Sequence, residues 1–167
     1  ESMFQGKPCL SDDASFKLKA QSEHWRREIK SAVDHGKLVI VFLSEFKQLS
    51  IATGDKQFSG TGRNQKTTRI VTDYDNYKSI PLNLKPFNSK GKEIKLSAKN
   101  SEIISAYWSE FSNVSSYNVI LEGEYTPCLV TKHGDKTVGA IVRSKNSNGA
   151  LVCLPDIDFY RDSFFVG

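Results

Sequence analysis

A run of six apolar residues, Leu38–Leu43 with the sequence LVIVFL, is the feature that most limits how this chain can fold. No polar residue interrupts the run, so it lacks the alternation typical of a strand with one face in water. An uninterrupted apolar strand next to turn residues is typical of a parallel sheet covered by helices on both faces. The run therefore predicts a buried central strand in an α/β fold.

The segment before this run has the pattern of an amphipathic helix from about Asp12 to His35. Ser11 is a suitable N-cap, and the two acidic residues after it suit the positive end of the helix dipole. Apolar residues recur at helical spacing at Trp25, Ile29, Ala32 and Val33. A helix that leads through a short break into a buried strand is half of a β-α-β unit. We therefore expect a three-layer, flavodoxin-like α/β domain with a mainly parallel central sheet, extending as a single domain over residues 1–167.

The last part of the chain has a different pattern, of short strands separated by turn residues. Strands are expected at Tyr117–Glu122, Cys128–Lys132, Thr137–Arg143 and Ala150–Leu154. Clusters of Gly, Asp, Asn and Ser separate the last three, which predicts a C-terminal antiparallel meander. A second helix, at about Glu102–Phe111, is expected before them because its apolar residues lie at helical spacing.

Residues 44–67 form a long polar stretch that contains three glycines. Connections of this length without secondary structure are uncommon in compact domains, and they are usually functional or disordered. We expect a long polar loop here, with a short hairpin as the alternative. A strand from Thr67 to Tyr74 should follow it.

The net charge of +4 is concentrated in two segments, Lys47–Arg69 and Lys85–Lys99. Basic residues greatly outnumber acidic ones in both, whose single acidic residues are Asp55 and Glu93. If such segments meet in space they form a patch that attracts phosphate. Nucleic-acid binding is therefore one hypothesis, and a solvated surface is the alternative. The candidate phosphate-binding residues are Arg63, Lys66 and Arg69.

Acidic residues follow three of the expected strands, which suggests a second hypothesis. Ligands of open α/β sheets bind outside the carboxyl ends of strands. The acidic residues there are Glu45, Asp73, Asp75, Asp156 and Asp158, of which Glu45, Asp156 and Asp158 are the candidate metal ligands. Carboxylate oxygens are the ligands that Mg²⁺ prefers, so these residues could support phosphoryl-transfer or nuclease-like chemistry. The alternative is that they accept backbone hydrogen bonds in turns.

Nucleophilic catalysis is not indicated. The chain has three cysteines, and Cys128 and Cys153 lie inside apolar stretches, where a thiol is a small core residue. The histidines lie on the first helix and in a turn, away from any strand-to-helix elbow. We predict neither a catalytic residue nor a cofactor.

Several segments together resemble the class I glutamine-amidotransferase-like superfamily, in its trehalose-utilisation-like branch. They are the helix feeding Leu38–Leu43, the segment Asp75–Pro81, the helix Glu102–Phe111 and the closing strands Thr137–Val142 and Ala150–Pro155. The nucleophile elbow of that superfamily, Gly-x-Cys-x-Gly, is absent from the sequence. The resemblance therefore implies a flavodoxin-like fold without glutaminase activity.

The first functional expectation is a non-catalytic binding or regulatory domain of a larger, bacterial-type intracellular protein. Its partner would be another protein or flanking domains of the same chain, because the sequence begins at Glu1 and ends on apolar residues. No apolar run approaches the ~20 residues that a membrane-spanning helix needs. The N-terminus also lacks the basic start and apolar middle of a signal peptide. We therefore expect a cytoplasmic location and no membrane partner.

Overall fold

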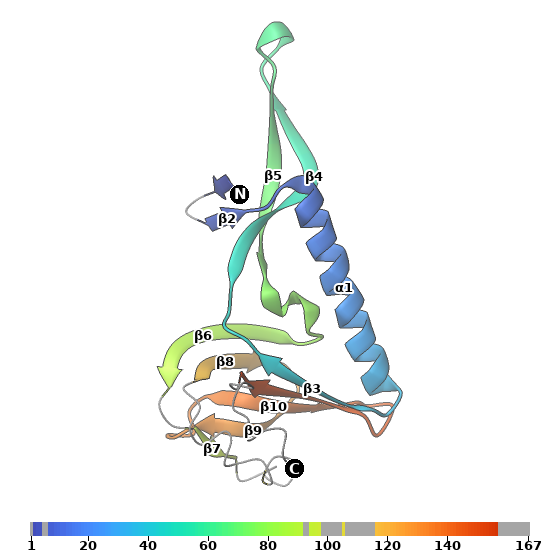
Figure 1. Cartoon of the computed structure of the whole chain (residues 1–167), viewed down its shortest axis with the longest axis vertical. Coiled ribbons are helices and arrows are strands. Elements are labelled where there is room, and N and C mark those ends of the chain that lie inside the picture. The colour runs from blue at the N-terminus through green and yellow to red at the C-terminus, as the bar shows by residue number, and fades with distance from the viewer. Residues whose placement is uncertain (1, 5–6, 92–93, 98–104, 106–115, 157–167) are drawn as a thin grey trace, which may run out of the picture. The chain divides into compact units, whose positions relative to one another are not determined.

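The computed structural model describes residues 2–4, 7–91, 94–97, 105 and 116–156 (Figure 1). The chain forms two compact units. Unit 1 contains Glu1–Arg27 and Phe46–Ile80, and unit 2 contains Glu28–Glu45 and Pro81–Gly167. The expectation of a single domain does not anticipate this division. Each sheet lies wholly within one unit.

The longest described helix is α1, Asp12–Asp34, where the sequence predicts it. Ser11 caps its first turn, because the Ser11 Oγ accepts a hydrogen bond from the N–H of Ala14 at 3.3 Å. The predicted apolar stripe is only partly right. Val33 is buried, whereas Trp25 is 52% exposed. Part of the face that the sequence marks as core is therefore in contact with solvent.

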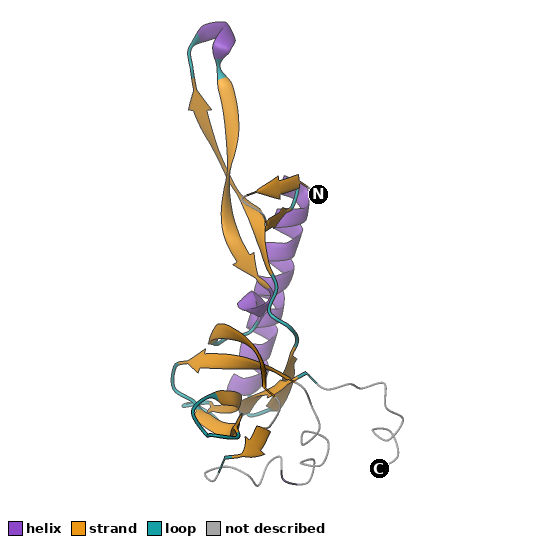
Figure 2. Ribbon diagram, turned by 90° about the vertical axis from the view of Figure 1, so that its left-hand side faces the viewer, coloured by secondary structure: helices purple, strands orange, loops and turns teal. Residues whose placement is uncertain are grey.

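Four strands of unit 1 form one sheet in the order β1-β2-β4-β5. Their bounds are β1 Ser2–Phe4, β2 Lys7–Cys9, β4 Gln48–Ser59 and β5 Lys66–Asp75. β4 and β5 form a long antiparallel hairpin, and β2 runs parallel to β4 at one point. Two short 3-10 turns complete the unit, η1 at Gly62–Asn64 and η2 at Asn76–Ser79. The hairpin is twisted, and its tip extends well beyond the rest of unit 1 (Figure 2).

The expectation of a long polar loop over residues 44–67 is wrong. This segment contains the whole of β4 and the turn η1. The alternative of a hairpin is right in kind, but the hairpin is long rather than short. The sequence does not reveal β4 because neither face of its outer half is buried. Apolar and polar side chains therefore do not alternate along it.

Unit 2 contains a five-stranded sheet in the order β3-β11-β10-β9-β7 and a separate antiparallel pair, β6-β8. The sheet strands are β3 Leu38–Leu43, β7 Ile94–Leu96, β9 Thr126–Thr131, β10 Thr137–Arg143 and β11 Ala150–Pro155. The pair comprises β6 Asn83–Gly91 and β8 Ser116–Glu122. β8 confirms one predicted strand. The predicted helix Glu102–Phe111 lies, apart from Ser105, outside the described residues.

The expected three-layer, flavodoxin-like fold with a mainly parallel sheet is contradicted. In the sheet of unit 2, β3 and β11 are parallel, and the other neighbouring strands are antiparallel. β3 lies at the edge rather than at the centre, with Leu38 56% and Ile40 49% exposed. The strand before α1 pairs with β4, so it does not form a β-α-β unit with β3. An apolar run shows that a strand is hydrophobic, but it does not show whether the strand lies at the centre or at the edge of a sheet.

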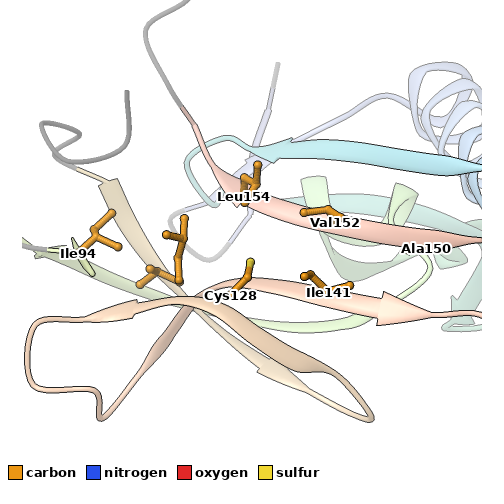
Figure 3. Packing of buried hydrophobic residues seen from close by; sticks show 8 residues of the cluster. Ile94, Cys128, Ile141, Ala150, Val152 and Leu154 are labelled. Carbon is orange, nitrogen blue, oxygen red and sulfur yellow. The ribbon is translucent and has the colours of Figure 1, made fainter. Parts of the chain in front are cut away.

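The predicted C-terminal meander is confirmed, because β9, β10 and β11 are consecutive antiparallel neighbours. The meander supplies most members of the buried cluster described in unit 2 (Figure 3), and Phe42 and Leu96 pack against that cluster. The buried cluster consists of Ile94, Cys128, Leu129, Val138, Ile141, Ala150, Val152 and Leu154. Cys128 and Cys153 are wholly buried, as predicted.

Candidate nucleic-acid interface

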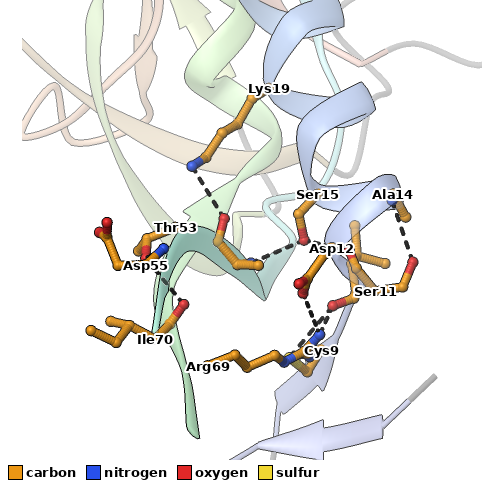
Figure 4. A network of polar contacts seen from close by, with 12 residues as sticks. Cys9, Ser11, Asp12, Ala14, Ser15, Lys19, Thr53, Asp55, Arg69 and Ile70 are labelled. Atoms are coloured by element: carbon orange, nitrogen blue, oxygen red, sulfur yellow. Dashed lines mark hydrogen bonds and ion pairs between the residues drawn. The ribbon is translucent and has the colours of Figure 1, made fainter. Parts of the chain in front are cut away.

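The inner half of the β4–β5 hairpin, residues 48–52 and 71–75, is firmly built into unit 1. Ile51 and Ala52 are at most 1% exposed. The backbone of Ala52 forms hydrogen bonds with two side chains of α1, Ser15 and Lys19, which are labelled in Figure 4. Its N–H donates to the Ser15 Oγ at 2.9 Å, and its carbonyl accepts from the Lys19 Nζ at 3.2 Å. Side chains of the helix therefore satisfy backbone groups of β4 that would otherwise be buried without partners.

A bulge separates the inner half of the hairpin from the outer half. Thr53, Gly54 and Asp55 of β4 all lie opposite the single residue Ile70 of β5. The Thr53 hydroxyl donates to the Ile70 carbonyl at 3.2 Å and accepts from the Asp55 N–H at 3.1 Å. Gly54 has φ +97°, and a Cβ placed there would lie 3.3 Å from the Phe16 ring. Bulges increase the local twist of a strand pair, so the bulge at Thr53–Asp55 changes the direction of the outer half of the hairpin.

Arg69, one of the predicted phosphate-binding residues, has several partners at the base of this outer half. Its Nη1 lies 2.9 Å from the Asp12 Oδ1. Its Nη2 donates to the Leu10 carbonyl at 3.0 Å and to the Cys9 Sγ at 2.7 Å (Figure 4). These contacts tie β5 to the start of α1. We therefore assign Arg69 an anchoring role and not a ligand-binding one.

The outer half of the hairpin presents its side chains to solvent. Every residue from Gly54 to Thr68 is exposed. This segment, called the arm below, carries three basic side chains and one acidic side chain, which are Lys56, Arg63, Lys66 and Asp55. It also carries an aromatic ring, because Phe58 is 62% exposed. The arm is therefore a basic, hydrogen-bonding ribbon.

The end of the arm is a tight turn with a fixed shape. Gly60 has φ +85°, and a Cβ at this position would lie 2.5 Å from the Asn64 carbonyl oxygen. Only glycine fits there without a shift of the backbone. The Asn64 N–H bonds to the Thr61 carbonyl at 3.2 Å and closes η1. The turn places Arg63 at the tip and Lys66 directly after it.

Strand pairing distributes the charges of the arm over both of its faces. Directly paired residues of an antiparallel ladder lie on the same face, and successive residues alternate. Lys56 and Phe58 therefore share one face, on which Phe58 pairs with Thr67. Lys66 pairs with Ser59 and lies on the other face. Each face of the arm therefore carries at least one cation, Lys56 on one face and Lys66 on the other.

The candidate metal ligands are only partly brought together. Glu45 follows β3 and Asp156 follows β11, and these strands are parallel neighbours whose last residues, Leu43 and Pro155, are paired. Both carboxylates therefore leave the sheet at the same end. Asp158 lies outside the described residues. Within the part of the chain that the structure describes, no three His, Cys, Asp or Glu side chains lie close enough to hold a metal ion.

The core thiols are poorly suited to nucleophilic chemistry. Burial raises the pKa of the Cys128 thiol from its ordinary value of 9.0 to about 11. Burial raises the pKa of the Cys153 thiol to about 12, and the nearby Cys128 adds to this shift. Because the thiolate is the nucleophile, both groups are in the unreactive form near neutral pH.

The second basic segment, Lys85–Lys99, lies in unit 2 and includes parts of β6 and β7. Of its basic residues, Lys95 is the one whose side chain is described, and it is exposed. No described helix has the length and apolar character needed to cross a membrane.

Comparison with known proteins does not assign a family to the chain. No protein-family model matches it, no curated protein matches its sequence, and no solved structure matches its fold. The resemblance to the glutamine-amidotransferase-like superfamily therefore stays a prediction. The site is defined by the geometry of the hairpin alone.

The candidates chosen from the sequence include Arg63 and Lys66 of the arm. Lys56 was counted only as part of the basic segment Lys47–Arg69, and Phe58 was not singled out. The signal that could have found them is the pair of glycines between Phe58 and Lys66, because Gly-containing turns join the strands of hairpins. The polar character of both flanks concealed this signal.

Proposed function

We propose that this chain is a non-catalytic nucleic-acid-binding module, and that the arm is the element that contacts the nucleic acid. The observation that supports the proposal best is that every residue from 54 to 68 is exposed, on a projecting hairpin with an excess of basic side chains. Because the arm buries no apolar side chain, it does not stabilise the fold through a hydrophobic core. Its exposed basic side chains are therefore better explained by binding to an external, negatively charged partner.

A two-stranded ribbon has the right dimensions to enter a duplex groove, because the major groove of B-DNA is about 12 Å wide. Lys56, Arg63 and Lys66 supply the positive charge for phosphate contacts. Hydroxyl and amide side chains also contact phosphates, and the arm carries several, including Thr61, Asn64 and Gln65.

Phe58 would act differently from the basic residues. An exposed ring at the surface of a basic ribbon can stack on an unpaired base or insert between base steps. Its position on the same face as Lys56 allows one backbone contact and one base contact from the same strand. The bulge at Thr53–Asp55 and the anchor at Arg69 would hold the base of the ribbon while its end enters the groove.

The test is a fluorescence-anisotropy titration of labelled duplex and single-stranded oligonucleotides at several salt concentrations. We expect binding whose affinity falls as salt rises, because phosphate contacts release counterions. The triple variant Lys56→Ala, Arg63→Ala, Lys66→Ala should bind much more weakly. Each lost phosphate contact should make the plot of log association constant against log salt concentration less steep, by about 0.9 for duplex DNA.

A matched control removes the same charges from elsewhere in unit 1 and unit 2. Lys17, Arg27 and Lys30 are exposed on α1, and their replacement by Ala also removes two lysines and one arginine. This control should keep nearly all of the affinity. Equal losses in the two triple variants would mean that only net charge matters. An absence of binding would contradict the proposal and favour a protein partner.

A further inference from the structure

Three consecutive side chains at the end of the arm are of the kinds that recognise bases in DNA. Arg63 and Asn64 are the last two residues of η1, Gln65 follows them, and all three are exposed. Arginine forms a bidentate pair with the O6 and N7 atoms of guanine, and Asn or Gln forms one with adenine. Contacts to phosphate position a protein on DNA but carry no sequence information. The end of the arm therefore carries side chains for reading bases as well as for binding phosphate.

The Arg63 guanidinium is available for such a pair. Among the residues that the structure describes, no group forms an ion pair or a hydrogen bond with the Arg63 side chain. Arg69 differs, because its guanidinium contacts Asp12 and the Leu10 carbonyl. The acidic residue of the arm, Asp55, lies in the bulge, at the opposite end of the arm from the turn. The N–H donors of Arg63 can therefore face a ligand.

The backbone that carries these side chains is held in one shape. The Asn64 N–H donates to the Thr61 carbonyl at 3.2 Å, and the Gln65 N–H donates to the Gly62 carbonyl at 3.3 Å. Gly60 packs so closely against the Asn64 carbonyl that no other residue fits without a shift of the backbone. Because the turn is already ordered, binding through it removes less conformational entropy than binding through a flexible loop.

The distance between the end of the arm and its nearest lysine suits the depth of a major groove. Ser59 and Lys66 are the last residues paired before the turn. Lys66 comes three residues after Arg63, so the backbones of the two residues are at most about 10 Å apart. The major groove of B-DNA is about 12 Å wide and about 8.5 Å deep, and it admits a two-stranded ribbon. With Arg63 at the floor of the groove, Lys66 would lie at its mouth, beside the phosphates.

We propose that the end of the arm enters the major groove of duplex DNA and that Arg63 reads a guanine there, with its guanidinium N–H groups donating to O6 and N7. The inference rests on the proposed nucleic-acid-binding function and makes that binding sequence-specific. Lys66 contacts phosphate whatever the sequence. Duplex RNA is a poor ligand, because its major groove is deep and too narrow for side chains to read.

The test begins with selection from a library of duplex DNA whose central base pairs are randomised. We expect the full chain to enrich a motif that contains a guanine. Fluorescence anisotropy then compares the enriched duplex with duplexes in which that guanine is replaced by adenine or by 7-deazaguanine, which lacks the N7 acceptor. Replacement by adenine should weaken binding roughly 5- to 150-fold, because the bidentate pair is lost. Arg63→Ala should bind all three duplexes with similar affinity.

Lys66→Ala is the matched control, because it removes one exposed cation of the arm close to Arg63. It should weaken binding to all three duplexes by a similar factor and so keep the preference for guanine. Circular dichroism establishes that both variants are folded. Equal affinity of the wild type for every duplex sequence overturns this inference and leaves the proposed function standing, whereas no binding to any oligonucleotide overturns both. A guanine preference that survives Arg63→Ala, or tighter binding to duplex RNA, overturns this inference alone.

Discussion

The inner and outer halves of the β4–β5 hairpin have the same secondary structure but opposite surroundings. The inner half buries Ile51 and Ala52 and receives hydrogen bonds from Ser15 and Lys19 of α1. The outer half is exposed along its whole length. An isolated two-stranded hairpin is at best marginally stable in water, so the inner half must hold the outer half in place. One half of the hairpin therefore supports the fold, and the other half leaves its side chains exposed to solvent.

The largest loss of stability is expected for a substitution at Ile51, in the inner half of the hairpin. Ile51→Ala removes a side chain with 0% exposure and should lower the free energy of unfolding by about 3 kcal/mol. Chemical denaturation followed by circular dichroism measures this change. A loss below about 1 kcal/mol would mean that the inner half is not a packed support.

Alkaline pH should destabilise unit 2 rather than the hairpin. The pKa values of Cys128 and Cys153 are raised to about 11 and about 12 in the folded chain. The unfolded chain therefore loses these protons first. The stability that the two protonated thiols contribute is fully present below pH 9.0, the ordinary thiol pKa, and falls above it by up to about 1.4 kcal/mol per pH unit for each thiol.

Thermal melts from pH 7.5 to 10.5 measure this alkaline decline, with the double variant Cys128→Ala, Cys153→Ala as the control. The control should be less stable at neutral pH, because the thiols fill space in the core, but its melting temperature should decline less at high pH. The same slope in both proteins would show that other groups cause the decline.

Arg69→Ala and Lys66→Ala remove one positive charge each, and they should separate anchoring from binding. Arg69→Ala loses the contacts with Asp12, Leu10 and Cys9 and should lower the free energy of unfolding by about 1–2 kcal/mol, because the ion pair is partly exposed. Lys66→Ala should change stability by less than about 0.5 kcal/mol and should weaken oligonucleotide binding. The reverse pattern would contradict the assigned roles.

Ser15→Ala tests the hydrogen bond between α1 and β4. It leaves the Ala52 N–H buried without its partner, so we expect a loss of about 1–2 kcal/mol in the free energy of unfolding. Ser22→Ala, at another position on α1, is a control that should have a smaller effect. Equal effects would indicate a change in helix propensity instead of a lost contact.

Phe58→Ala should have the smallest effect on stability. The ring is 62% exposed, so the free energy of unfolding should change by less than about 0.5 kcal/mol. Its loss should nevertheless weaken binding to single-stranded oligonucleotides, where stacking contributes about 1–3 kcal/mol per base. Unchanged affinity for every oligonucleotide would remove Phe58 from the interface.

Elements with local signals could be predicted from the sequence. The helix α1 was located by Ser11 and its apolar spacing, and the meander by the turns between its strands. The position of β3 could not be predicted, because an apolar run does not specify its neighbours. The length of β4 was missed because an exposed strand depends on backbone pairing, which leaves little pattern in the side chains.

In the sequence, charge alone selects the candidate phosphate-binding residues. Arg63, Lys66 and Arg69 are equivalent in the sequence, because each is a cation in one basic segment. The structure separates them, because Arg69 meets Asp12, which lies 57 residues away along the chain. A partner at that separation follows from the fold and not from local sequence.

The most direct test of the central claim is removal of the arm alone. Residues 56–68 would be replaced by a short Gly-Ser-Asn-Gly loop, which keeps the bulge, Arg69 and the inner half of the hairpin. The shortened chain should unfold cooperatively with a melting temperature close to that of the wild type, and it should lose its salt-dependent affinity for oligonucleotides. A shortened chain that is stable and still binds with wild-type affinity would contradict the account.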